Sequence, residues 1–283
     1  MTIRELLHET AQAFETTGIP SARLDAEVLL AFCLGCDRLE FYKSPDQQIN
    51  EESQILFQKL ITRRQKWEPV AYITGRKEFW SFTLEINSHV LIPRPDTEVI
   101  VEEALSLHRE IACKEIRILD IGTGSGAIAI ALAKEIPQAR IIATDISSAA
   151  LEVARKNARH LGVASQIDFR LGNLFEPVDG VFDFLVSNPP YIAADEYEKL
   201  PAGVKSYEPK EALLAGKSGM EFYEKLVYQA DNYLKNDAWL LLEIGATQEQ
   251  RLRRIMENAK FYEHVTMRTD YAGLPRVMKA RRK

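Results

Sequence analysis

A strand, a glycine loop and a helix follow one another near the middle of the chain, and this order limits the possible folds more than any other feature. Residues 117–121 form an apolar run of the length expected for a buried strand, and residues 127–135 are strong helix formers. The loop between them consists of Gly122, Thr123, Gly124, Ser125 and Gly126. This succession opens the βαβ unit of nucleotide-binding proteins, so it predicts a parallel sheet with helices packed on it.

Asp120 stands directly before this loop and indicates the kind of nucleotide that binds there. A dinucleotide site presents backbone amides to a pyrophosphate, and a neighbouring carboxylate would repel that anion. S-adenosylmethionine carries an ammonium group and a nucleoside but no phosphate, so the acid favours this methyl donor over NAD. We therefore predict that Asp120 and the five loop residues bind S-adenosylmethionine, with S-adenosylhomocysteine as the product.

The next two predicted strands supply further candidates for the donor site. Residues 140–144 lead to Asp145, which lies 19 residues after the last glycine of the loop and is placed to accept hydrogen bonds from both ribose hydroxyls. The alternative role for Asp145 is the N-cap of the following helix. Residues 166–171 lead to Asn173 and Leu174 at the place expected for an adenine pocket, where the alternative is an ordinary Gly-Asn turn.

A fourth predicted strand, residues 182–187, ends at the tetrad Asn188, Pro189, Pro190 and Tyr191. The prolines prevent further strand pairing and form a rigid corner at the sheet edge where α/β proteins bind ligands. The Asn188 side chain and the Pro189 carbonyl offer acceptors, and Tyr191 offers an aromatic face. This set suits a planar –NH2 group, so the tetrad is the candidate for catalysis and substrate binding, with Asn188 also beside the donor. The alternative is a Pro-Pro turn that merely ends a strand.

Helical patterns fill residues 1–75 and predict a small all-α bundle. The first helix begins with a capping box formed by Thr2 and Glu5, and its apolar residues recur at helical spacing. Glycines and a proline mark the other boundaries. The expected limits are Thr2 to Gly18, Ser21 to Gly35, Asn50 onward, and Pro69, in the first turn, to Gly75.

The pattern changes after the bundle. Residues 78–91 alternate like strands around a turn at Asn87-Ser88, so we interpret residues 76–114 as a connector made of a hairpin and a helix. Over residues 115–283 strands and helices alternate, which predicts an α/β fold with a doubly wound, mostly parallel seven-stranded sheet. Its last three strands are expected at residues 238–243, 265–269 and 276–279, the final two forming an antiparallel edge.

Composition and charge exclude several classes of protein. The chain has 283 residues, 46% of them hydrophobic, and no apolar run approaches the ~20 residues of a membrane-spanning helix. Its N-terminus lacks the features of an export signal. The net charge of −5 argues against nucleic acid as the substrate, because proteins that bind a phosphate backbone usually present a basic face. We therefore expect a cytoplasmic monomer that acts on another kind of molecule.

The cysteines and histidines do not form a recognisable site. Cys33 and Cys36 have the spacing of a redox motif, but no second pair and no histidine cluster follows them, and Cys113 stands alone. The five histidines are scattered along the chain. We expect a reducing compartment, no metal site and no catalytic histidine.

Several runs resemble the protein-(glutamine-N5) methyltransferases that modify peptide-chain release factors, the PrmC/HemK family, and the match covers nearly the whole chain. Besides the glycine loop and the tetrad, the matching runs are residues 21–30, 68–75, 78–80 and 91–98. The tetrad alone is shared with amino-methyltransferases that act on adenine and cytosine. The combination of runs indicates glutamine as the acceptor.

The resemblance implies a Rossmann-like class I methyltransferase domain and methyl transfer to the N5 amide nitrogen of the glutamine in the Gly-Gly-Gln loop of a class 1 release factor. It also implies that the N-terminal helices recognise that protein. At Asn173 and Leu174 the chain departs from the family, which commonly has an acid followed by an aromatic residue. The alternatives are an N6-adenine-type nucleic-acid amino-methyltransferase and a binding module without activity.

Overall fold

The computed structural model describes residues 1–110 and 115–283. Cys113 and the end of the predicted connector lie outside these residues. Among the helices described, none is both long enough and apolar enough to span a membrane. The described residues also contain no group of three or more histidine, cysteine or acidic side chains arranged to hold a metal ion.

The chain divides into two compact units. The first comprises Met1–Arg76 together with Pro201–Tyr207, and the second comprises Lys77–Leu200 and Glu208–Lys283. The chain therefore enters the first unit twice, once at its start and once through a short segment that follows the tetrad.

The first unit is a helical bundle, as the sequence predicts. The capping box at Thr2 and Glu5 is present, and Asn50 accepts a hydrogen bond from the backbone of its helix. Ser21 stands at its predicted cap position, but its hydroxyl donates to Asp25 (2.9 Å) instead of capping the helix. The helices are α1 (Ile3–Thr16), α2 (Ala22–Leu34), α3 (Glu40–Lys43), α4 (Glu51–Gln65), α5 (Val70–Thr74) and α10 (Ala202–Tyr207); α3 and α10 were not predicted, and Pro69 precedes α5.

The segment around α10 contacts the turn that follows α4 in the same unit. The Tyr207 hydroxyl donates to the backbone carbonyl of Lys66 (2.9 Å). A Cβ atom at Gly203 would lie 2.8 Å from the carbonyl oxygen of Trp67, so only glycine permits this approach. These contacts join residues that are more than a hundred positions apart in the sequence, which explains why local patterns did not reveal them.

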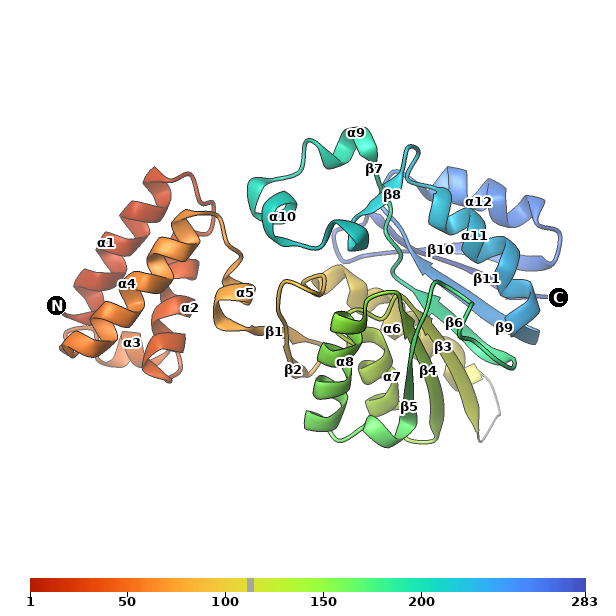
Figure 1. Cartoon of the computed structure of the whole chain (residues 1–283), viewed down its shortest axis with the longest axis horizontal. Helices are drawn as coiled ribbons and strands as arrows, with labels where there is room; N and C mark the ends of the chain where they lie inside the picture. The colour runs from red at the N-terminus through yellow and green to blue at the C-terminus, as the bar shows by residue number, and fades with distance from the viewer. Residues whose placement is uncertain (111–114) are drawn as a thin grey trace. The chain divides into compact units, whose positions relative to one another are not determined.

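The second unit is built on the predicted sheet, which is confirmed as seven-stranded and mostly parallel (Figure 1). The strands in spatial order are β10 (Tyr262–Thr269), β11 (Pro275–Arg282), β9 (Leu234–Glu243), β6 (Phe182–Ser187), β3 (Ile116–Ile121), β4 (Ala139–Asp145) and β5 (Ile167–Leu171). Strand β11 is antiparallel to both of its neighbours, so it lies inside the sheet and the edge strand is β10. The prediction that the last two strands form an antiparallel edge is therefore confirmed.

Helices cover both faces of the sheet. On one side α6 (Glu98–Glu110), α7 (Ala127–Glu135) and α8 (Ser148–His160) pack next to one another, and on the other side α11 (Glu221–Ala230) packs against α12 (Glu249–Asn258) (Figure 1). The core beneath α11 and α12 takes alternate residues of the strands, among them Leu119, Ile121, Leu240 and Leu242. Because strand side chains alternate between faces, Asp120 and Glu243 point to the face that α6 and α7 cover.

Two small sheets complete this unit. The hairpin of β1 (Arg76–Phe79) and β2 (Phe82–Glu85) is present, but the chain reverses at Trp80 and Ser81, whereas Asn87 belongs to a separate turn, in which its carbonyl accepts from Val90. The predicted position of the hairpin turn is therefore wrong. A second pair, β7 (Ile192–Ala193) and β8 (Leu214–Gly216), was not predicted because its strands are too short to show a pattern.

An electrostatic contribution to the stability of the bundle is expected from Asp25, because both side chains of its ion pair are largely buried. Arg64 donates to its carboxylate at 2.8 Å, and both side chains are only 11% exposed. The Asp25→Ala substitution leaves this guanidinium buried without its partner, so we expect a loss of about 2–4 kcal/mol in the stability of the bundle. Amide hydrogen exchange in α2 and α4 measures this loss.

The matched control is Asp46→Ala. Its pair with Arg4 has side chains that are 77% and 65% exposed, so its removal should change exchange very little. Equal exchange in the two variants would show that the Asp25 pair contributes nothing beyond an ordinary surface contact.

Candidate active site

The carboxyl ends of the central strands meet at one edge of the sheet. In the ladder Ile121 pairs with Thr144 on one side and with Ser187 on the other, and Ser187 pairs in turn with Leu242. The Ser187 hydroxyl also donates to the Ile121 carbonyl at 2.7 Å. The residues that follow these strand ends are therefore neighbours. Strand order reverses between β3 and β6, which is the switch point where open α/β sheets bind ligands.

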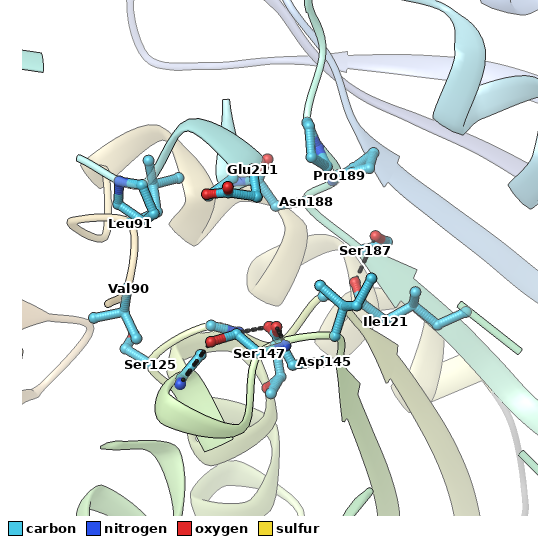
Figure 2. Close-up of a pocket in the computed structure, with 18 of the residues that line it drawn as sticks. Val90, Leu91, Ile121, Ser125, Asp145, Ser147, Ser187, Asn188, Pro189 and Glu211 are labelled. Carbon is cyan, nitrogen blue, oxygen red and sulfur yellow. Dashed lines mark hydrogen bonds between the residues drawn. The ribbon is translucent and has the colours of Figure 1, made fainter. Parts of the chain in front are cut away.

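A cavity of about 830 Å³ opens at this edge (Figure 2). Most of the predicted site residues line it: Gly122, Thr123, Gly124, Ser125, Asp145, Asn173, Leu174, Asn188, Pro189 and Pro190. Asp120, Gly126 and Tyr191 are not among the lining residues. The structure thus brings together residues from four separate loops. Three of the predicted residues do not line the cavity.

The glycine loop leaves open space on the side that faces the cavity. The backbone amides of Gly122 and Thr123 both donate to the Thr144 carbonyl at 2.9 Å, which holds the loop over the end of β4. Gly124 has φ +56°, and a Cβ atom built there would meet nothing within 4 Å. The absence of side chains therefore opens a cradle in which a ligand can approach the backbone.

Asp120 lies beneath this loop and is fully buried. One of its oxygens accepts a hydrogen bond from the Thr123 hydroxyl (2.6 Å), while Oδ1 has no partner among the described residues. Burial raises the pKa of Asp120 to about 7, and the nearby Asp145 carboxylate adds to the rise. A carboxylate directly beneath the loop makes the local potential negative when it is ionised, so the position favours a ligand that carries an ammonium group over an anionic one.

Asp145 reaches the cavity from the end of β4. Its two oxygens accept hydrogen bonds from the backbone amides of Gly124 and Ser147, each at 2.9 Å. The N-cap of α8 is Ser147, whose hydroxyl accepts from Ala150, so Asp145 is not the cap. Burial raises the pKa of Asp145, and the amide bonds oppose that rise. A carboxylate has further lone pairs, which remain available to ligand hydroxyls.

Asn173 and Leu174 follow β5 on the same side of the cavity. The Asn173 amide donates to the Glu176 carboxylate at 3.2 Å, which closes the turn. Leu174 has φ +51°, a left-handed conformation that is unfavourable for a residue with a Cβ atom. Backbone strain of this kind is concentrated at functional sites, where the surrounding structure holds it in place.

Asn188 follows β6 at the centre of the edge. Its side-chain nitrogen donates to the hydroxyl of Thr97 at 3.2 Å. Thr97 belongs to the short 3-10 helix η1 (Pro95–Thr97), and its hydroxyl also bonds the carboxylate of Glu243 at the end of β9. Among the described residues none donates to the carbonyl oxygen of the Asn188 side chain, so this oxygen can accept from a ligand.

The structure places the Tyr191 ring against the core beneath α11 and not in the cavity wall. Its backbone carbonyl accepts from the side-chain nitrogen of Gln248 (2.9 Å), and the oxygen of the same side chain accepts from Gly245 (3.0 Å). Burial raises the pKa of Tyr191 to about 12. The partly buried aromatic ring thus packs against the core, and Gln248 fixes the chain where the tetrad ends.

Several functional candidates were missed by sequence reasoning. Glu211 lines the cavity near Asn188 (Figure 2). Buried Glu208 accepts from Arg94 (2.5 Å) and from the backbone of Ile92 (3.1 Å), which holds the segment of the cavity wall that precedes η1. The signal for this segment was the run 91–98, and the signal for Glu243 was an acid at the end of an otherwise apolar strand. Glu211 had no local signal.

Comparisons with known proteins indicate one family for both the N-terminal helices and the sheet-containing part of the chain. Two family models match, the PrmC N-terminal domain over residues 5–75 and the methyltransferase small domain over residues 99–202. The release factor glutamine methyltransferase of Geobacter sulfurreducens is 40% identical over 281 residues, which cover 99% of this chain and 96% of the relative. The protein of the same name from Coxiella burnetii is 40% identical over 284 residues, which cover 100% and 99%.

A solved structure agrees in fold. A methyltransferase from Pyrococcus furiosus matches 82% of this chain and 98% of its own length, with a TM-score of 0.51 and 19% sequence identity. At this identity the likeness concerns the fold alone.

The position of Asp145 generates a prediction about donor binding. Asp145→Ala removes the acceptor for ligand hydroxyls and also frees the Gly124 amide, so we expect S-adenosylmethionine to bind at least about tenfold more weakly. Isothermal titration calorimetry measures the change. Ser147→Ala is the control, because it removes the cap of α8 and keeps the carboxylate. If the two variants bound the donor equally well, Asp145 would serve only to hold the turn.

Proposed function

Since the chain belongs to the family of release factor glutamine methyltransferases, we propose that the cavity at the edge of its sheet holds the methyl donor and a release factor glutamine side by side. The reaction is the transfer of a methyl group from S-adenosylmethionine to the N5 amide nitrogen of the glutamine in the Gly-Gly-Gln loop. The observation that carries the assignment of the site is the orientation of Asn188, whose nitrogen is engaged by Thr97 and whose carbonyl is free.

The donor side of the cavity fits S-adenosylmethionine. The carboxylate of Asp120 lies beneath the glycine loop and favours the ammonium group by its charge, and the Gly124 cradle admits the ligand close to the backbone. Asp145 offers acceptors for the ribose hydroxyls, while Asn173 and Leu174 would contact the adenine. The donor supplies an electrophilic methyl group on a positively charged sulfur.

The part of the site that binds the glutamine must increase the reactivity of an amide nitrogen toward the methyl group. This nitrogen is a poor nucleophile because its lone pair is delocalised into the carbonyl, and it gains positive charge as the new bond forms. The Asn188 side-chain carbonyl and the Pro189 backbone carbonyl accept from its two N–H groups, and these bonds strengthen as the charge develops. Neutral acceptors avoid the desolvation cost of a buried carboxylate. The two prolines keep these acceptors in place and so contribute by orientation.

The proton that the nitrogen loses leaves to water. Tyr191 is unsuited to take it, because its pKa of about 12 keeps the phenol protonated at neutral pH. We assign to Tyr191 a structural role at the end of the tetrad, with its ring in the core and its backbone bonded to Gln248. This differs from the stacking role that the sequence suggested.

The helical unit is the proposed recognition element for the release factor. It matches a family domain distinct from the methyltransferase domain, and remote contacts of this kind supply binding energy that orients a substrate. Glycines beside the glutamine allow the loop to enter a narrow site, since no Cβ atom intrudes. Release factors act in the cytoplasm, so we propose that the protein works there, as a monomer.

The assignment is tested with labelled donor and two acceptors, an intact class 1 release factor and a structured RNA. We expect label on the release factor, lost when its glutamine is replaced by alanine. Label on the RNA alone would replace this function with that of a nucleic-acid amino-methyltransferase.

Asn188→Ala is expected to slow methylation of the release factor by about 10²-fold or more, the scale of one lost transition-state hydrogen bond. Donor affinity should remain close to that of the unaltered protein, because Asp120, Asp145 and the glycine loop are unchanged. Single-turnover kinetics at saturating donor measure the effect. An unaltered rate would remove Asn188 from the catalytic site.

A variant that lacks residues 1–75 should still bind the donor but methylate an intact release factor poorly. Its α10 segment loses the Lys66 and Trp67 contacts, so donor binding serves as the control that the second unit is folded. A short Gly-Gly-Gln peptide should be a poor substrate for both proteins, since it is too short to contact the bundle. Equal rates on the intact release factor would show that the bundle has no part in recognition.

A further inference from the structure

The carboxamide of an asparagine has two ends of nearly the same shape and opposite hydrogen-bonding character. If the Asn188 side chain turned by 180° about its last bond, it would present an –NH2 group to the –NH2 group of the acceptor. Donor would then face donor, and the stabilisation of the transition state would be lost. The proposed reaction therefore requires something that distinguishes the two ends of Asn188.

The immediate partner, Thr97, does not make this distinction by itself. A threonine hydroxyl both donates and accepts, so a free one would bond either end of a carboxamide. In the structure Oγ1 of Thr97 accepts from the Asn188 nitrogen at 3.2 Å, and Thr97 is almost fully buried, with 4% of its surface exposed. Its single hydrogen must therefore be directed elsewhere for the arrangement to hold.

The carboxylate of Glu243 accepts the hydrogen bond from the Thr97 hydroxyl. The register of β6 and β9 pairs Ser187 with Leu242, so Asn188 and Glu243 are the next residues on adjacent strands. Glu243 points to the face of the sheet that α6 covers, and α6 is preceded directly by η1, where Thr97 lies. The side chain is buried, with 1% exposed, and Thr97 hydrogen-bonds to it.

A buried carboxylate at this position lowers the stability of the fold, so its presence calls for a functional explanation. Oε2 of Glu243 has no hydrogen-bond partner among the described residues, so only the bond from Thr97 is accounted for at this side chain. A glutamate buried with one oxygen unsatisfied destabilises the fold, and a neutral apolar residue would fill the same space more favourably. Because an ionised carboxylate accepts and never donates, it forces the Thr97 hydrogen to point toward Glu243.

We propose that Thr97 and Glu243 are positioning residues that form a one-way hydrogen-bond chain, in which the carboxylate orients the hydroxyl and the hydroxyl orients the Asn188 carboxamide with its carbonyl toward the acceptor amide. This inference rests on the proposed function, since it assigns the means by which the tetrad is held ready for an –NH2 substrate. Neither residue is required to touch the reacting atoms.

The chain depends on the charge of Glu243. Burial raises the pKa of Glu243 to about 7, while the Thr97 bond, Arg276 and Arg94 oppose the rise and Asp96 adds to it. Among the described residues, the phenols of Tyr191 and Tyr223 also interact with Glu243, and burial raises the pKa of each. Protonated Glu243 can donate to Thr97, which frees the hydroxyl to donate to Asn188 and lets the carboxamide turn. The rate should therefore fall as the pH drops below about 7.

The first test uses methylation of an intact release factor at saturating donor, a condition that removes effects of Asp120 on donor binding. Thr97→Val keeps the shape of the side chain and removes both hydrogen bonds, so we expect kcat to fall about tenfold to a hundredfold, the range seen when a group that orients a functional side chain is lost. Donor affinity should not change. Thr97→Ser retains the hydroxyl and should retain most of the activity.

Two readouts separate positioning from a merely structural effect. In the Asn188→Ala background, Thr97→Val should cause little further loss, because the side chain that it orients is absent. The loss of rate below pH 7 should also be present in the unaltered protein and absent in Thr97→Val. The proposal would be overturned if the fold-losses in kcat of the two single variants multiplied in the double variant. It would also be overturned if kcat were unchanged in Thr97→Val.

A second test does not depend on activity. In protein labelled with 15N in asparagine side chains, the Asn188 resonances are identified by their loss in Asn188→Ala. We expect its two amide protons to have well-separated shifts that change with pH near 7 in the unaltered protein, and to lose that response in Thr97→Val. Resonances that were identical in the two proteins would refute the hydrogen-bond chain. If the unaltered protein failed to methylate a release factor, the proposed function would fall, and this test would still decide the orientation of Asn188.

Discussion

The pairing of β6 with β3 and β9 is the constraint on which the site depends. Ser187 sits in the middle of this pairing, fully buried, with its hydroxyl bonded to the Ile121 carbonyl, so the ends of the strands cannot slip relative to one another. A shift by one residue would turn Asn188 to the other face, because strand side chains alternate. The glycine loop, Asp145, Asn188 and Glu243 come together only because this register is maintained.

Two buried carboxylates, Asp120 and Glu243, lie at this edge on the same face of the sheet. Burial raises the pKa of each to about 7. An acid whose pKa is higher in the folded than in the unfolded state lowers the stability of the fold progressively as the pH rises from the unfolded to the folded pKa, and the cost is complete above the folded pKa. The fold therefore carries an energetic burden at neutral pH that core packing offsets. We attribute this burden to function, to the donor in one case and to the orientation of Asn188 in the other.

The segment that follows the tetrad joins the two units through the covalent chain. Its ends are held together by the short parallel pair of β7 and β8, where the Ile192 amide donates to the Leu213 carbonyl at 3.0 Å. Between these ends the chain makes α9 (Ala194–Tyr197), contributes α10 to the helical unit, and returns through η3 (Lys210–Ala212), which carries Glu211 into the cavity wall. One loop thus belongs to both the proposed recognition unit and the catalytic edge.

The sequence by itself determined the local elements: the capped helices, the glycine loop, the strand ends with Asp145 and Asn188, and the seven-stranded sheet. Each leaves a local signal, either a period of hydrophobic residues or a turn former. Tertiary structure alone decided that Tyr191 faces the core, that β11 lies inside the sheet, that residues 201–207 belong with the N-terminal helices, and that Thr97 and Glu243 stand behind Asn188. These outcomes depend on contacts between residues far apart in the chain, and such contacts leave no period or motif in the sequence.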